Sequence, residues 1–112
     1  MKFYISLPNP ELARGNDPAF SFSAHGAEAL AEQLRNALSN PAYSQAWLSS
    51  LQEDDAEHID SQLLAVDADA KVSGAQKDLG INLIVDTKLN GNAFKHRLRL
   101  LAGNHWLLKD VW

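Results

Sequence analysis

The chain has 112 residues, of which 46% are hydrophobic and 21% charged, with no cysteine and a formal net charge of −4. This length suits one domain over residues 1–112, and the hydrophobic content excludes an intrinsically disordered chain. The lack of cysteine excludes disulfide scaffolds, cysteine-ligated zinc, iron–sulfur clusters and thiol nucleophiles. No apolar stretch approaches the ~20 residues that cross a bilayer, so the sequence predicts no membrane insertion.

The start of the chain and its charge distribution bear on location and partners. The first eight residues hold one lysine and an alternating run that ends at Pro8, unlike the continuous apolar block of a signal peptide, so we expect a cytoplasmic protein. Residues 1–70 carry three basic and eleven acidic side chains, whereas residues 71–112 carry seven basic and three acidic ones. Such asymmetry is typical of solvated faces and can also mark a surface for a partner of opposite charge.

An alternating pattern predicts a strand at residues 2–7. Phe3, Ile5 and Leu7 are apolar and are separated by single residues, which is the period of a half-buried strand. Residues 9–18 concentrate turn formers and predict a surface loop. A second, short strand is expected where two phenylalanines alternate with serines at residues 20–23.

Two consecutive helices are predicted next. Residues 24–39 repeat alanine and leucine at three- and four-residue spacing, as in an amphipathic helix that packs on a sheet. Asn40 followed by Pro41 has the form of an N-cap with proline at the first helical position, so a second helix is expected to about Leu51. Trp47 of this helix should lie near the edge of the core, because a buried indole needs a hydrogen-bond partner.

An acidic run at residues 52–60 is the candidate for metal binding. Asp54 and His58 would share a helical face, and Asp67 and Asp69 form an Asp-x-Asp pair. The glycine and the terminal glutamate of a calcium loop are missing at the required spacing. We therefore expect a solvated acidic surface with one further helical turn, and no bound metal or cofactor.

Period-two alternation from residue 64 predicts a series of strands. They cover residues 64–73, residues 81–88 and, after Asn90-Gly91, a third segment through residue 100. Asn-Gly is the strongest short signal for a hairpin turn. A two-residue turn there pairs Asp86 with Lys95, and it leaves the other face of the hairpin almost entirely apolar.

The last predicted strand, at residues 105–112, has two registers. A three-residue connection would place His96 opposite Asp110 on the core face, whereas a two-residue connection would pair Lys95 with Asp110. We prefer the first register because it turns both C-terminal tryptophans inward. A carboxylate that orients an imidazole beside an apolar cavity is typical of a general base, so His96 and Asp110 are the candidate catalytic residues.

The opposite face of the predicted hairpin carries Lys95, Arg97 and Arg99, with Ile84 beside them. Basic side chains with an apolar neighbour suit an acidic protein partner or a second copy of the chain. They also suit a phosphate backbone, but a sequence pI of about 5.4 weighs against nucleic acid. These four residues are the predicted binding surface.

The ending Ala-Gly-Asn-His-Trp-Leu-Leu-Lys-Asp-Val, residues 102–111, is similar to the last hairpin of nuclear-transport-factor-2-like, cystatin-type cones. In those domains a glycine turn, a tryptophan and an alternating strand close a curved sheet over helices. The resemblance implies a pocket between sheet and helices that holds a small molecule. The opening strand departs from that family, whose chains begin with helices.

Together the patterns predict an α+β domain with an N-terminal strand, two consecutive helices and an antiparallel meander of about four strands, with the helices on one face. The sequence lacks the motifs of α/β-hydrolases, zinc metalloproteases, P-loop proteins and dinucleotide-binding proteins. The leading hypothesis is a non-enzymatic domain that binds a protein partner or forms a homodimer. The alternatives are a small-molecule-binding cone or a weak acid–base enzyme, and a nucleic-acid-binding domain.

Overall fold

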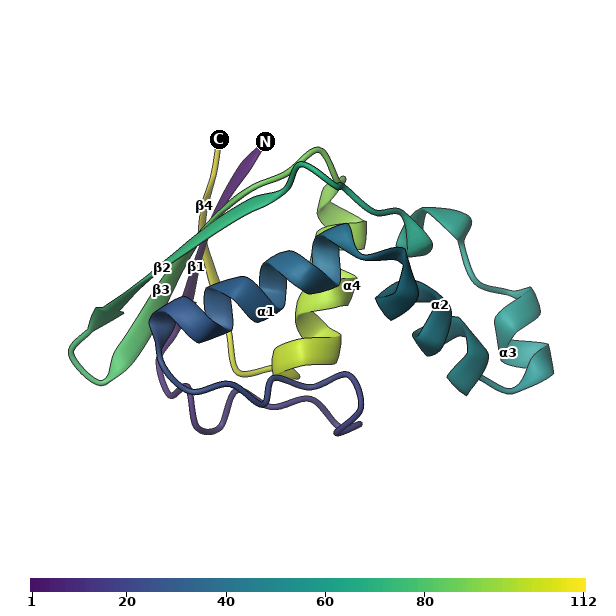
Figure 1. Ribbon diagram of the computed structural model, residues 1–112, viewed down its shortest axis with the longest axis horizontal. Coiled ribbons are helices and arrows are strands. Elements are labelled where there is room, and N and C mark those ends of the chain that lie inside the picture. The colour runs from purple at the N-terminus through teal and green to yellow at the C-terminus, as the bar shows by residue number, and fades with distance from the viewer.

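The computed structural model describes residues 1–112, apart from the side chain of Ala56. Its elements are, in chain order, β1 (Lys2–Leu7), α1 (Ala27–Ser39), α2 (Pro41–Ser50), α3 (Glu53–Glu57), the 3₁₀ helix η1 (Ser61–Leu64), β2 (Lys71–Lys77), β3 (Gly80–Asp86), α4 (Gly91–Ala102) and β4 (Leu107–Val111). The predicted α+β class with an N-terminal strand and a four-stranded antiparallel sheet is confirmed (Figure 1).

The strands form one antiparallel sheet in the order β2-β3-β1-β4. β1 and β3 are central, while β2 and β4 form the two edges. The sequence of elements β1-α1-β2-β3-α4-β4 gives the split β-α-β topology of ferredoxin-like domains. Residues 41–64, which hold α2, α3 and η1, are inserted between α1 and β2 and extend to the right of the sheet in Figure 1.

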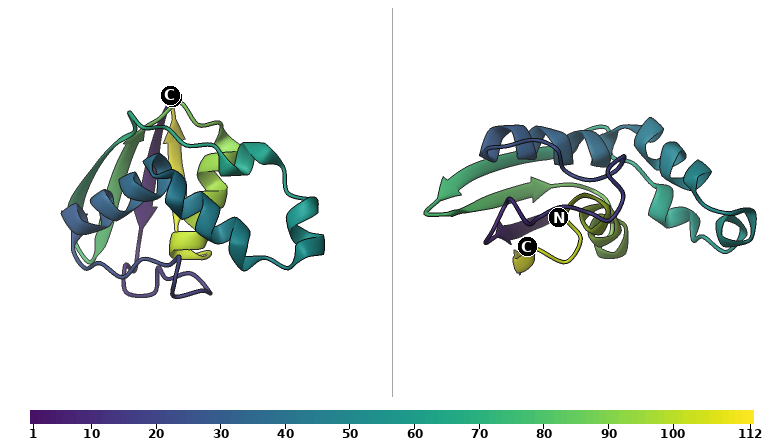
Figure 2. Two further views of the ribbon diagram at one scale, coloured as in Figure 1. Left: turned by 45° about the vertical axis from the view of Figure 1, so that its right-hand side comes forward. Right: turned by 90° about the horizontal axis from the view of Figure 1, so that it is seen from below.

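Helices α1 and α4 pack on the same face of the sheet, and the other face has no helix over it (Figure 2). Phe3 and its alternate neighbours in β1 point to the helices and are buried. Phe94 of α4 stacks on Phe3 with ring centroids 4.1 Å apart. α1 approaches β2 closely at Gly74, where a β-carbon would lie 2.4 Å from the carbonyl oxygen of Ala27. A side chain at position 74 would therefore force α1 away from the sheet.

The two predicted helices are present. α1 begins at Ala27 rather than at residue 24. Asn40 caps α2 as predicted, because its side chain accepts a hydrogen bond of 2.9 Å from the backbone N–H of Ala42, and Pro41 takes the first helical position. The start of this helix was predicted correctly because the cap residue and the proline both indicate the same helix start.

The short strand predicted at residues 20–23 is not formed. Phe20 and Phe22 are buried, but they lie in the irregular segment before α1, and the backbone N–H of Phe22 donates to the carbonyl oxygen of Leu101 at 2.8 Å. These phenylalanines therefore pack the loop against the end of α4 instead of adding a strand to the sheet.

Residues 91–102 form helix α4, so the predicted hairpin strand is wrong. Asn90 is the N-cap of this helix, and its side chain accepts a hydrogen bond of 2.8 Å from the backbone N–H of Ala93. Gly103, with a φ of 61°, follows the last helical residue. The buried side chains have helical spacing and are Ala93, Phe94, Arg97, Leu98, Leu101 and Ala102. The Asn-Gly pair therefore starts a helix rather than a hairpin turn.

The strand predicted at residues 64–73 begins only at Lys71. Before it, Asp67 is buried, and its carboxylate accepts hydrogen bonds from the hydroxyl of Thr87 at 2.9 Å and from the backbone N–H of Lys88 at 2.8 Å. Asp67 therefore holds the segment before β2 next to the segment after β3.

The last strand, β4, pairs with β1 and not with the segment before it. Tyr4 lies opposite Asp110, and the register shifts between Tyr4 and Ile5. The ladder extends to the chain end, where Lys2 and Trp112 exchange two backbone hydrogen bonds of 2.6 and 2.9 Å. The final hairpin on which the resemblance to cystatin-type cones depends is therefore not formed.

Candidate functional site

The sheet face without a helix over it is the candidate site, and we call it the outer face. Alternate residues of β1 are driven inward by their apolar side chains, so the residues between them point outward. The same holds for β3. The members of the outer face are Lys2, Tyr4, Ser6, Lys71, Ser73, Ala75, Lys77, Asn82, Ile84, Asp86, Leu107, Lys109, Asp110 and Trp112.

The strand registers arrange most of these side chains in three rows across the sheet. In the order β2, β3, β1, β4 the rows are Lys71-Asp86-Lys2-Trp112, Ser73-Ile84-Tyr4-Asp110 and Ala75-Asn82-Ser6-Leu107. We call them the charged, apolar and polar rows after the two residues at the centre of each. The centre of the face therefore changes in character from charged to apolar to polar along the strands.

Large apolar side chains are exposed on the outer face. Trp112, Leu107 and Ile84 keep 55%, 48% and 41% of their surface accessible. Tyr4 is partly buried and lies between Ile84 and β4. A set of exposed apolar side chains bordered by polar ones is typical of an interaction surface.

The charges at the centre of the charged row are unpaired. Lys2 and Asp86 are cross-strand partners, yet the ion pairs found among the described residues, Arg35–Glu32 and Lys88–Asp69, involve neither of them. Both side chains are exposed. They are therefore available to charges on a partner molecule.

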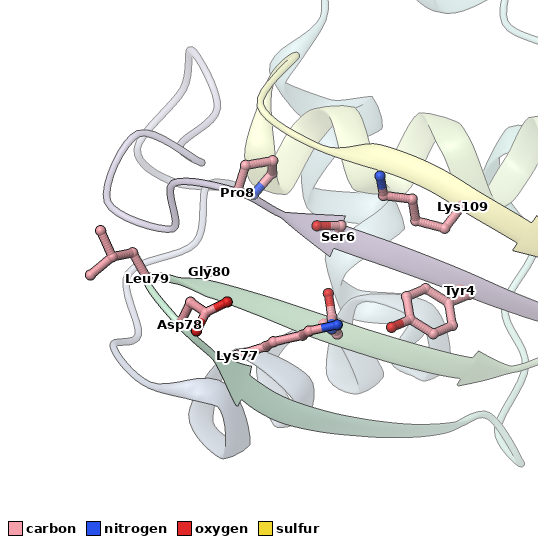
Figure 3. A pocket seen from close by; sticks show the side chains of 9 residues that line it. Tyr4, Ser6, Pro8, Lys77, Asp78, Leu79, Gly80 and Lys109 are labelled. Carbon is pink, nitrogen blue, oxygen red and sulfur yellow. The ribbon is translucent and has the colours of Figure 1, made fainter.

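A hollow of about 610 Å³ lies at the end of the outer face next to the turn between β2 and β3. Figure 3 shows Lys77 and Lys109 reaching over the sheet from its two sides, with Ser6 and the ring of Tyr4 on the strand between them. Ammonium and hydroxyl groups are hydrogen-bond donors that suit a small anion. Asp78 also lines the hollow, and its carboxylate would repel a highly charged anion.

The predicted basic strip is not formed on the sheet. Ile84 is on the outer face, but Lys95, Arg97 and Arg99 lie on α4, on the other side of the sheet. Arg97 is only 1% exposed. A helix turns successive side chains by about 100°, so three residues at spacing two do not share a face as they would in a strand.

Arg97 is a buried clamp rather than a binding residue. Its guanidinium donates to the carbonyl oxygens of Ala37 in α1, at 2.7 Å, and of Leu63 in η1, at 2.9 Å. It also donates to the carbonyl oxygen of Ala65. The side chain therefore connects α4 to the end of α1 and to the inserted segment.

His96 and Asp110 are not cross-strand partners, since His96 lies on α4 and Asp110 lies opposite Tyr4 in the sheet. The predicted register that joined them is wrong. The imidazole packs edge-on against Trp47 of α2, with ring centroids 4.4 Å apart, and its Nδ1 atom is buried without a hydrogen-bond partner. Burial, assisted by the charges of Arg97 and Arg99, lowers the pKa of His96 below its ordinary value of 6.5.

The described part of the chain was compared with the requirements of a metal site and of a membrane-spanning helix. Its histidine and carboxylate side chains include no group of three or more placed to hold a metal ion. The aspartates of the predicted Asp-x-Asp pair have separate roles, since Asp67 is a buried hydrogen-bond acceptor and Asp69 pairs with Lys88. None of the described helices has the length and apolar character needed to cross a membrane.

Comparison of the chain with protein-family models, with curated proteins and with solved structures found no match to any of them. The geometry of the outer face and its chemistry therefore carry the functional argument.

Most residues of the outer face were missed as functional candidates. The alternation of residues 2–7 already places Lys2 and Tyr4 on one side of a strand, so half of the central charged pair could have been found from sequence. The neighbours of β1 could not, because β3 and β4 are distant in sequence and their pairing follows from the helix at residues 91–102.

Proposed function

We propose that the protein is a non-enzymatic, self-associating domain that binds a second copy of itself through the outer face. The observation that carries this proposal is the absence of any helix over that face, in the described chain, where Ile84, Leu107 and Trp112 are exposed among unpaired charges. Covering these side chains removes apolar surface from water, which is the main favourable contribution to association.

The composition of the outer face suits a protein partner. Interfaces combine an apolar centre rich in aromatic and aliphatic side chains with a polar rim. Here Tyr4 and Ile84 are central, while Lys71 and Lys77 lie on the edge strand. A second copy suits this face, because the face carries charges of both signs and the aspartates of one copy can meet lysines of an identical face.

The expected strength follows from the size of the face. Strand rise and strand spacing give a face of roughly 23 by 19 Å, so two copies would bury on the order of 900 Å². Specific interfaces usually exceed ~1,000 Å², so this one falls just below that size, in the range of weak and transient complexes. We therefore expect reversible association with a Kd in the micromolar range.

A matched pair of variants tests the proposal. Ile84→Asp places a carboxylate at the centre of the outer face, whereas Leu12→Asp makes the same kind of change at an exposed residue of the loop before α1. Sedimentation velocity should show weaker association for Ile84→Asp and wild-type behaviour for Leu12→Asp. Equal association of all three proteins would overturn the assignment of the outer face as the interface.

A second candidate function is the binding of a small anion in the hollow between Lys77 and Lys109. The observation that favours it is the presence of two ammonium groups, without ion-pair partners in the described chain, above hydroxyl-bearing side chains. Inorganic phosphate titrated into the protein should shift the NMR signals of β1 and β4. The shifts should disappear in the variant with both Lys77→Gln and Lys109→Gln and persist in Lys95→Gln. Persistence in the double variant would reject this candidate.

A further inference from the structure

We infer that two copies pack outer face to outer face around a two-fold axis that runs along the strands, between β1 and β3. The inference rests on the proposed self-association and specifies its geometry. It follows from the order of residues in the three rows and from the requirement that a two-fold interface be complementary to itself.

Rotation about this axis leaves the position of each row along the strands unchanged. It reverses the order of the four strands within each row. β1 of one copy then lies over β3 of the second copy, and β2 lies over β4. The residues at the centre of each row therefore meet their own cross-strand neighbours from the other chain. Each such contact occurs twice, once on either side of the axis.

In the charged row this geometry creates ion pairs. Lys2 of one copy faces Asp86 of the second copy, and Asp86 faces Lys2 of the second copy. Lys71 faces Trp112 of the second copy, a contact in which an ammonium group can lie over an aromatic ring. The charges left unpaired within one chain therefore find partners in the dimer.

The other two rows are complementary under the same operation. In the apolar row Tyr4 faces Ile84 of the second copy, which buries the central apolar surface. In the polar row Ser6 faces Asn82 of the second copy, so a hydroxyl meets an amide that can both donate and accept. Further out, Ala75 faces Leu107 of the second copy.

Other two-fold axes give poorer contacts. An axis shifted onto β1 or onto β3 places Lys2 against Lys2, or Asp86 against Asp86, of the second copy. An axis across the strands places the charged row over the polar row, where Ser6 and Asn82 offer no charge. Like charges at an interface cost several kcal/mol, so the charges of the two central strands favour the axis between β1 and β3.

The geometry is compatible with ordinary sheet packing. Two stacked sheets lie ~10 Å apart with their strands rotated by about 30°, because each sheet is twisted. The central apolar row stays in register under this rotation. The charged row lies two residues from the apolar row along the strands, so the rotation displaces Lys2 sideways from Asp86 of the second copy. The long side chain of Lys2 can bridge this displacement.

Charge reversal on two separate chains tests the pairing. In a homodimer of Lys2→Asp, the introduced carboxylate faces Asp86 of the second copy, and in a homodimer of Asp86→Lys the introduced ammonium group faces Lys2. Both homodimers should be weaker than the wild type by about tenfold or more. A mixture of the two variants should form a heterodimer, because both contacts are then between opposite charges. The matched controls are Lys95→Asp on α4 and Asp55→Lys on α3, which change the net charge equally and should associate like the wild type.

The outcomes separate this inference from the proposed function. A wild-type dimer with a preferred heterodimer of the two variants supports both. A wild-type dimer that is unaffected by either reversal overturns the pairing and leaves self-association intact. A wild-type monomer overturns both.

Folding of the variants is checked by circular dichroism. If either reversal variant unfolds, the neutral variants Lys2→Gln and Asp86→Asn replace it. Each should reduce the salt dependence of dimer formation between about 50 and about 500 mM salt. The Debye length shortens over this range, so attraction between exposed charges is increasingly screened. An unchanged salt dependence in both neutral variants overturns the pairing.

Discussion

Lys2 and Asp86 are direct cross-strand partners on the outer face, and neither joins an ion pair in the described chain. Opposite charges in such positions often pair, with a contribution of roughly 0.2–1 kcal/mol. Here both side chains remain exposed on the two central strands of a sheet face that no helix covers. In the proposed dimer each of these charges would face its opposite on the second copy, because the two-fold axis lies between their strands.

Replacement of Arg97 should destabilise the fold. Arg97→Met would leave the carbonyl oxygens of Ala37 and Leu63 without their donor, and we expect a loss of about 3 kcal/mol in the free energy of unfolding. Arg97→Lys should recover little of it, because one ammonium group cannot reproduce the fork of the guanidinium. Urea denaturation measures the loss, and the exposed Arg99→Met serves as the control. A loss below about 1 kcal/mol for Arg97→Met would contradict the role of the clamp.

Asp67 should make stability depend on acidic pH. The backbone N–H of Lys88, together with the Thr87 hydroxyl, lowers the pKa of Asp67 below its ordinary value of 3.8. Because the pKa of Asp67 is lower in the folded protein, its stabilising effect is complete at a pH above the pKa of the unfolded chain. The effect is lost as the pH falls through the pKa of the folded protein. Asp67→Asn should therefore unfold more easily at pH 7, by roughly 1–3 kcal/mol, and show a shallower loss of stability in acid.

Thermal unfolding between neutral and strongly acidic pH measures both effects. Asp69→Asn is the matched control, because Asp69 is exposed and its 3.9 Å contact with Lys88 lies at the surface, where ion pairs contribute little. Equal behaviour of the two variants would show that the buried hydrogen bonds of Asp67 do not hold the segments before β2 and after β3 together.

His96 should titrate at a lower pH than an ordinary histidine. Burial against Trp47 disfavours the imidazolium, so the pKa of His96 lies below 6.5. The neutral imidazole of His96 contributes fully to stability at a pH above the pKa of histidine in the unfolded chain. This contribution is lost as the pH falls through the lower pKa of the folded protein. NMR titration of the imidazole measures this, and Trp47→Ala should raise the pKa by admitting water. A pKa at or above 6.5 in the wild type would show that the contact between α2 and α4 is open in solution.

The sequence predicted an element well where two local signals agreed. At residues 2–7 strict alternation was followed by proline, and at Asn40 a cap residue was followed by proline at the first helical position. At Asn90 the signals conflicted, because Asn-Gly suits a hairpin turn and asparagine also suits a helix N-cap. Phe94 and Leu98 are four residues apart and fit either a strand or a helix, so alternation did not decide between them.

The error at α4 changed the predicted site more than the predicted fold. The class remained α+β, because β4 pairs with β1 and the four strands form one antiparallel sheet. The predicted functional residues on α4 lost their expected places, because Arg97 lies in the interior and His96 lies against Trp47. Ile84 alone of the predicted binding residues stayed on the outer face, as its position depended only on the alternation within β3.

The measurement that tests the central claim most directly is the solution mass of the unmodified chain, determined by sedimentation equilibrium from about 5 to about 500 µM, a range that brackets a micromolar Kd. Self-association through the outer face predicts that the mass rises with concentration from 12.3 kDa toward twice that value and no further. A two-fold interface closes on itself, so larger assemblies are not expected. A mass that stays at 12.3 kDa over the whole range, or one that rises well beyond the dimer, would contradict the account.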